Sequence, residues 1–212
     1  MTDNDARREE ILLAALPHVP FDGWGQAALN RGAADAGHDD ATARRLFQGG
    51  AAEMIACHSR YADRIMLKAL DTCDLDAMKV RERIITAVRT RLEQNSAHRE
   101  AVRRGLSLLA LPQHAPLATR LLYRTVDAMW YAAGDTSTDY NFYSKRALLA
   151  GVYSATLLYW LNDKSEGYEA TWEFLERRVA DVLKVPKVMA RAGRVLDRLP
   201  DPFRLLRTAR SL

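Results

Sequence analysis

The sequence is poor in cysteine and contains no long uninterrupted apolar run. Its 212 residues include only two cysteines, at positions 57 and 73, which excludes a disulfide framework. The longest apolar run, residues 147–161, is interrupted by Gly151, Ser154 and Thr156, and it is shorter than the ~18–20 residues that a spanning helix needs. The first ten residues are polar and acidic, so we expect no signal or targeting peptide and a soluble or at most peripheral protein.

The common signatures of catalysis are also missing from the sequence. It contains no HExxH or CxxC metal motif, no GxSxG nucleophile motif and no glycine-rich phosphate loop. Its five histidines are scattered, and the adjacent side chains of Cys57 and His58 would point about 100° apart on a helix. We therefore expect no metal site, no cofactor and no catalytic cluster, and we predict that the protein is not an enzyme.

What the sequence does contain is typical of an all-α globular protein. It is 48% hydrophobic and 27% charged, and apolar residues recur at spacings of three and four in most windows. Period-two strand patterns are missing, and glycine or proline lies at most of the expected helix ends. We predict helices over residues 6–16, 24–36, 40–47, 50–70, 75–95, 98–110, 116–133, 138–162, 168–184 and 188–210.

The first 49 residues have the layout of a helix-turn-helix unit: short helices at 24–36 and 40–47 flank a turn at Gly37. This layout resembles the TetR-type regulators, in which three N-terminal helices bind DNA and the remainder binds a small molecule. However, residues 1–60 carry six basic and nine acidic side chains, and the second short helix opens with Asp39 and Asp40, which suit a helix N-terminus but not a phosphate-lined groove. We expect a scaffold that does not bind DNA. The alternative is a TetR-type transcriptional regulator that senses a hydrophobic ligand.

Five aromatic residues lie within fourteen positions around the polar loop 134–138. Such a cluster either belongs to the core or forms a protein interface, where aromatic residues, Met and Arg are enriched. Composition alone does not separate the two alternatives. The aromatic residues are Trp130, Tyr131, Tyr140, Phe142 and Tyr143.

The helix that follows is apolar nearly all round, which predicts that it is buried on every side. Gly151, Ser154 and Ala155 make part of this helix thin. The thin part either packs tightly against another helix or borders an apolar cavity that could hold a hydrophobic ligand.

The C-terminal segment differs from the rest of the chain in charge. From Lys184 onward it has eight basic and two acidic residues, so that the remainder of the chain is slightly acidic. Apolar residues at helical spacing are flanked by arginines, a pattern typical of a helix that lies on an anionic membrane; docking on the body or a dimer arm are the alternatives. The expected membrane-contacting residues are Lys187, Val188, Arg191, Arg194, Val195, Arg198, Leu199, Phe203, Arg204 and Arg207.

Four stretches of the chain resemble one family of proteins. Residues 11–24 (ILLAALPHVPFDGW), 134–143 (GDTSTDYNFY), 158–163 (LYWLND) and 171–178 (TWEFLERR) are similar, in order, to the coenzyme Q biosynthesis protein nine family, and the resemblance runs from about residue 8 to 187. It implies a TetR-like fold that binds lipids, including isoprenoid quinone intermediates, and a C-terminal membrane helix. It also implies a partner, the di-iron demethoxyubiquinone hydroxylase.

Carried onto this chain, the resemblance gives specific expectations. Residues 1–49 would form the helix-turn-helix-like unit, 50–185 a lipid- and partner-binding body, and 186–212 the membrane-associating tail. We expect a homodimer from a bacterium, at the cytoplasmic face of the inner membrane. The partner surface would comprise Asp127, Met129, Trp130, Asp139, Asn141, Phe142, Tyr143 and Arg146, where position 142 carries Phe in place of the Trp of eukaryotic members. The bound lipid would contact Leu148, Gly151, Val152, Ala155, Leu158, Trp172 and Leu175.

Overall fold

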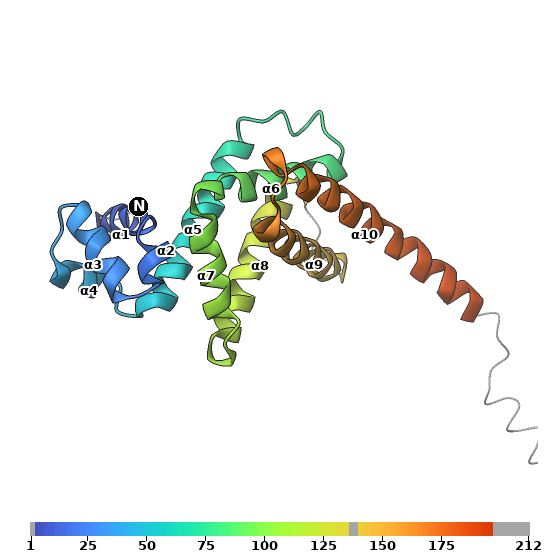
Figure 1. Cartoon of the computed structure of the whole chain (residues 1–212). Helices are drawn as coiled ribbons and strands as arrows, with labels where there is room; N and C mark the ends of the chain where they lie inside the picture. Colours follow the sequence, from blue (N-terminus) through green and yellow to red (C-terminus); the bar gives the residue numbers. More distant parts are fainter. Residues whose placement is uncertain (1–2, 136–139, 197–212) are drawn as a thin grey trace, which may run out of the picture.

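A computed structural model of the chain describes residues 3–135 and 140–196. At residues 140–141 and 183–196 it describes the backbone but not the side chains. Every regular element in these two ranges is a helix, which confirms the all-α prediction (Figure 1). The α-helices are α1 (Asp3–Ala15), α2 (Val19–Asp22), α3 (Gln26–Asp35), α4 (Asp40–Leu46), α5 (Gly50–Leu70), α6 (Val80–Glu93), α7 (Arg99–Leu109), α8 (Ala115–Ala132), α9 (Tyr140–Asn162) and α10 (Glu169–Leu196). Three short 3₁₀ turns lie at Ser96–His98, Pro112–His114 and Glu166–Tyr168.

The N-terminal helices α1–α4 form the expected helix-turn-helix-like unit at one end of the molecule (Figure 1). Gly37 makes the turn with a φ of 74°, a conformation that favours glycine. Asp39 then caps α4 by accepting a hydrogen bond from the Thr42 amide at 2.7 Å. The helices α1 and α3 touch at Gly32, where an added Cβ would lie 2.5 Å from the backbone nitrogen of Ala15. The sequence analysis did not predict α2, which forms around Pro20 at its second position.

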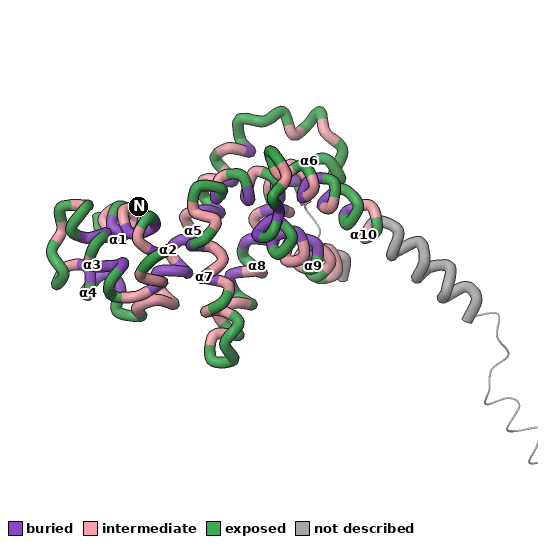
Figure 2. The backbone as a smooth tube through the Cα atoms, in the orientation of Figure 1, coloured by how far each residue is buried: buried purple, intermediate pink, exposed green. Residues whose placement is uncertain are grey.

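Two clusters of buried apolar side chains hold the helices together, and Figure 2 shows the buried residues gathered where the helices meet. One cluster fills the N-terminal unit and continues into α5, α7 and α8 through Ile55, Ala101 and Leu121. The other joins α5, α6, α8, α9 and α10 around the fully buried Trp160. The helix-turn-helix-like unit therefore shares its core with the body.

Two predictions about the C-terminal half are wrong. The helix 147–161 is not buried on every side, because Leu158 is 58% and Tyr159 39% exposed; neighbouring helices cover only part of its circumference. The predicted helix end at Pro186 is also absent, since α10 runs without interruption from Glu169 to Leu196. A proline removes one backbone hydrogen bond and costs about 3 kcal/mol inside a helix, and α10 continues through Pro186 despite this cost.

Candidate functional site

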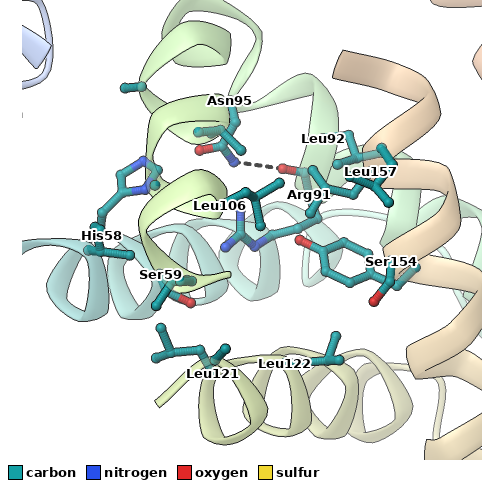
Figure 3. Close-up of a pocket in the computed structure, with 18 of the residues that line it drawn as sticks. His58, Ser59, Arg91, Leu92, Asn95, Leu106, Leu121, Leu122, Ser154 and Leu157 are labelled. Carbon is teal, nitrogen blue, oxygen red and sulfur yellow. Dashed lines mark hydrogen bonds between the residues drawn. The ribbon is translucent and has the colours of Figure 1, made fainter. Parts of the chain in front are cut away.

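A cavity of about 320 Å³ lies between α5, α6, α7, α8 and α9 in the middle of the molecule (Figure 3). Most of its wall is apolar, with Ile55 from α5, Leu92 from α6, Leu106 from α7, Leu121 from α8 and Leu157 from α9. Its volume lies at the lower end of the ~300–1,000 Å³ range of ligand pockets. The cavity is the main candidate for a small-molecule site.

The two ends of this cavity differ in exposure and in polarity. The end toward solvent is bordered by four apolar side chains: Leu106, Leu109, Leu122 and Leu158. Leu158 is 58% exposed and the other three are half-buried. We call these four residues the mouth. The deep end contains a group of polar side chains that are all at least nine-tenths buried, and we call it the polar end: His58, Arg91, Asn95 and Tyr153.

The charge of Arg91 is compensated by a buried carboxylate next to the cavity. The Arg91 Nε donates a hydrogen bond to Asp63 Oδ1 at 3.1 Å, and the Thr125 hydroxyl donates to the same oxygen at 2.8 Å. Burial raises the pKa of Asp63, and the attraction of Arg91 opposes this shift. Arg91 and Asp63 are 6% and 3% exposed, so they form a buried ion pair between α6 and α5.

His58 is held in its neutral form at the polar end. Burial and, to a smaller extent, the nearby positive charge of Arg91 together lower its pKa from 6.5 to about 3. Burial likewise raises the pKa of the Tyr153 phenol, which keeps its proton. With the ion pair balanced and these two groups uncharged, the polar end carries no net charge at neutral pH.

The wall of the cavity next to the N-terminal unit is built by Trp24. Its indole Nε1 donates a hydrogen bond to the carbonyl oxygen of Ala101 at 2.7 Å, and its ring lies 5.7 Å from that of His58. Gly105 lets this ring approach α7, because an added Cβ would lie 3.3 Å from Trp24 Nε1. The loop before α3 and the first half of α7 are thereby fixed around the cavity.

The predicted lipid-contacting residues lie mostly outside this cavity. Only Leu158 of the seven lines it. Val152, Trp172 and Leu175 are buried in the core between α9 and α10, and Gly151 is exposed. Helix α9 does line the cavity as expected, but through Tyr153, Ser154, Leu157, Leu158 and Trp160. Leu148 and Ala155 are half-buried and do not line it.

The contributions of α5, α6 and α7 to the cavity were missed altogether. Arg91 and His58 carried no sequence signal, since each is one of several polar residues along an amphipathic helix. The only available signal was Gly105 in the middle of a predicted helix, where a glycine often marks a close contact.

A second candidate site is the junction of α8 and α9, where Arg146 organises the predicted partner residues. Its guanidinium donates to Asp127 at 2.6 Å and to Asp135 at 3.1 Å. Its Cζ lies 3.3 Å from the centre of the Phe142 ring, a cation–π contact. The Trp130 indole donates to the carbonyl oxygen of Lys145 at 3.2 Å. The structure therefore brings Asp127, Trp130, Phe142 and Arg146 together.

Some residues of this junction are exposed at the surface, and others are buried beneath them. Tyr143 is 67% exposed, and Tyr131, which was placed in the aromatic cluster but not among the partner residues, is 77% exposed. Met129 is fully buried and Arg146 is 5% exposed, so the expectation that Met129 contacts a partner directly is wrong; it faces inward from α8, where side chains repeat every 3–4 residues. Asp139 and the side chain of Asn141 lie outside the described residues.

The predicted membrane-contacting side chains lie outside the described part of the chain. The backbone of Lys187, Val188, Arg191, Arg194 and Val195 belongs to α10, with the side chains outside the description. Arg198, Leu199, Phe203, Arg204 and Arg207 lie beyond the described residues. No helix in the described part of the chain is both long and apolar enough to cross a membrane, and no group of three or more His, Cys, Asp or Glu side chains there is arranged to hold a metal ion.

Comparison with known proteins relates this chain to one family and one fold. Residues 115–186 match the family model described as COQ9. The chain is 36% identical over 185 residues to the ubiquinone biosynthesis protein COQ9, mitochondrial, of Rattus norvegicus, covering 84% of this chain and 59% of the relative. It is 37% identical over 186 residues to the Homo sapiens protein of the same name, covering 84% and 58%. The chain thus spans about three fifths of the length of these relatives.

Among solved structures, the chain is similar to a TetR transcriptional regulator from Nitrosomonas europaea. The TM-score is 0.68 with 21% sequence identity, and the match covers 83% of this chain and 97% of the regulator. This likeness confirms the predicted TetR-like all-α fold.

Proposed function

This chain belongs to the COQ9 family, and from that premise we propose that it is a non-catalytic, lipid-binding accessory protein of ubiquinone biosynthesis. In this role it binds isoprenoid quinone intermediates at a membrane and presents them to the di-iron demethoxyubiquinone hydroxylase. The names of the curated relatives support the biosynthetic pathway.

The observation that carries the lipid-binding part is the cavity between α5 and α9. It is lined mainly by leucine and other apolar side chains, and its mouth is apolar as well. Transfer of each buried CH₂ from water into such surroundings is favourable by ~0.8 kcal/mol. A quinone with a long isoprenoid chain therefore leaves a bilayer for water only at a high free-energy cost, and an apolar cavity lowers that cost by replacing one apolar environment with another.

The junction of α8 and α9 supports the partner-binding part of the proposal. Tyr131 and Tyr143 are exposed, and the half-buried Trp130 and Phe142 lie beside them. Aromatic residues over a rigid, well-packed base are typical of the centre of protein interfaces. The double ion pair of Arg146 supplies that rigidity, because it ties α9 to the end of α8.

A membrane location for residues 186–212 and a homodimer are further parts of this proposal. They depend on the segregated basic charge of the tail and on the family resemblance. The alternative, a TetR-type regulator, predicts salt-dependent binding to an operator. The excess of acidic residues in positions 1–60 and the carboxylates of Asp39 and Asp40 at the start of α4 argue against it.

The proposal is tested by extracting the purified protein with organic solvent and identifying the extract by mass spectrometry. We expect near-stoichiometric isoprenoid quinone or phospholipid from the natural sequence. Leu106→Trp, which fills the cavity, should reduce the recovered lipid several-fold, whereas Ser107→Trp on the exposed side of α7 serves as the matched control and should not. Equal recovery from both variants, or an empty extract from protein purified together with membranes, would contradict lipid binding in this cavity.

A further inference from the structure

The two ends of the cavity suit two different ends of a ligand. The mouth is formed by Leu106, Leu109, Leu122 and Leu158, which offer no hydrogen bonds. The polar end lies at the bottom, where water has little access and where each unpaired polar group would cost free energy. A ligand that is apolar at one end and oxygenated at the other matches this arrangement in only one orientation.

Two side chains at the polar end, Arg91 and Tyr153, have hydrogen-bond donors that are not used within the described part of the chain. Arg91 donates from Nε to Asp63, and its two terminal nitrogens have no hydrogen-bond partner among the described residues; Figure 3 shows this guanidinium pointing into the cavity. The Tyr153 side chain is 6% exposed and lines the cavity, and its hydroxyl likewise has no such partner there. Both groups can donate to an oxygen of a ligand.

The balance of charge restricts what that oxygen can belong to. The Arg91 guanidinium is paired with the Asp63 carboxylate at 3.1 Å, so a carboxylate or phosphate in the cavity would face a negative charge already in place. A second anion would leave that buried site with a net charge, which is costly. A carbonyl or ether oxygen of an uncharged ring accepts the same hydrogen bonds without this cost.

We propose that the cavity binds an uncharged, oxygenated ring head-first, with Arg91 and Tyr153 donating hydrogen bonds to a ring oxygen and the apolar chain leaving through the leucine mouth. This inference rests on the proposed lipid-binding function and deepens it by assigning the orientation of the ligand and the side chains that hold its head. The volume of about 320 Å³ agrees with a ring and the first part of a chain. The ring is then sequestered while bound, and it must leave through the mouth before another enzyme can act on it.

The test compares three probes that share a decyl chain and differ in the head: decylbenzoquinone, decylbenzene and undecanoate. Binding to the full-length protein is followed by quenching of tryptophan fluorescence by the quinone, since Trp24 and Trp160 line the cavity, and by displacement of the quinone with the other two. We expect the quinone to bind most tightly. Tyr153→Phe should weaken quinone binding about three- to ten-fold, the loss of one hydrogen bond, and leave the binding of decylbenzene and undecanoate unchanged.

Leu158→Ala at the mouth is the control that distinguishes contacts of the head group from contacts of the chain. It should weaken the binding of all three probes to a similar extent. If decylbenzene binds as tightly as the quinone and Tyr153→Phe alters neither, the ring does not reach the polar end, and the orientation is overturned while lipid binding stands. If undecanoate binds most tightly, the site prefers a charged head and the proposed uncharged ring is wrong. If none of the probes binds the natural sequence, the proposed lipid-binding function fails together with this inference.

Discussion

The guanidinium of Arg91 and the carboxylate of Asp63, 28 positions apart in the sequence, meet at 3.1 Å between α6 and α5. The same carboxylate accepts a hydrogen bond from Thr125 on α8 and lies 3.9 Å from Arg124 on the outer side of that helix. One buried acid thus connects three helices and separates the cavity from a surface groove that Asp63 and Arg124 also line. The ion pair holds the polar end of the cavity in place.

Asp63→Asn should therefore destabilise the protein. It leaves the Arg91 charge buried without its partner, and removing one member of a buried pair typically costs about 3–5 kcal/mol in the free energy of unfolding. Urea denaturation measures this value. The double variant Asp63→Leu with Arg91→Met removes both charges and should recover much of the loss, whereas a single Asp63→Asn variant as stable as the natural sequence would show that the pair contributes little.

His58 gives the protein a defined sensitivity to acid. Its pKa falls from 6.5 in the unfolded chain to about 3 in the folded protein, so below pH 6.5 the unfolded state binds a proton that the folded state does not. Stability contributed by neutral His58 is fully present above pH 6.5 and is lost as the pH falls toward 3. Between pH 7 and pH 5 we expect a loss of about 2 kcal/mol.

The contribution of His58 is isolated by comparison with His58→Leu, which has no titrating group at this position. Denaturation at several pH values should give a steeper decline between pH 7 and pH 5 for the natural sequence than for the variant. Parallel curves would mean that His58 is hydrated and protonated in the folded state.

Close contact of α1 and α3 should make Gly32 intolerant of a side chain. A Cβ at this position would lie 2.5 Å from the Ala15 backbone nitrogen and 2.6 Å from its Cα, and backbone atoms cannot rotate away. We expect Gly32→Ala to lower the free energy of unfolding by about 1–3 kcal/mol, the usual cost of overpacking. The control is Gly151→Ala, at an exposed glycine inside α9 where no atom lies within 4 Å; a similar loss of stability from both changes would contradict the close packing.

Local signals in the sequence were sufficient for the helix-turn-helix-like unit, because Gly37 and Asp39 act on their own backbone and nearest neighbours. They failed at Pro186, where a proline predicts a helix end and α10 nevertheless continues. The cavity could not be placed in this way. The polar end depends on which faces of α5, α6 and α9 meet. Rotating α9 about its axis by one residue position would turn Val152 instead of Tyr153 toward the cavity.

At the junction of α8 and α9, exposure predicts which variants affect a partner and which affect folding. Phe142→Ala and Tyr143→Ala should each weaken binding to the demethoxyubiquinone hydroxylase about five-fold or more, as for an interface residue worth at least 1 kcal/mol, with little change in stability for Tyr143→Ala. Met129→Ala should instead cost about 2–5 kcal/mol of stability, since its side chain is fully buried. Affinity is measured by calorimetry and stability by denaturation.

Tyr123→Ala is the matched control for these changes, because Tyr123 is a 44% exposed tyrosine on α8 outside the junction. It should leave hydroxylase binding unchanged. Unaltered affinity of Phe142→Ala and Tyr143→Ala would move the interface away from this surface.

The basic tail predicts a charge-dependent attachment to membranes. Each Lys or Arg near an anionic surface contributes about 1 kcal/mol, so reversing the charge of Arg191, Arg194 and Arg198 together should abolish flotation with anionic vesicles. Reversal of Arg31, Arg44 and Arg45, which are exposed in the N-terminal unit, changes the net charge by the same amount and should leave flotation intact. High salt should reduce the attachment of the natural sequence, because screening shortens the reach of surface charges. If the tail variant floats as well as the natural sequence, the tail does not anchor the protein; if both triple variants fail equally, net charge alone governs attachment.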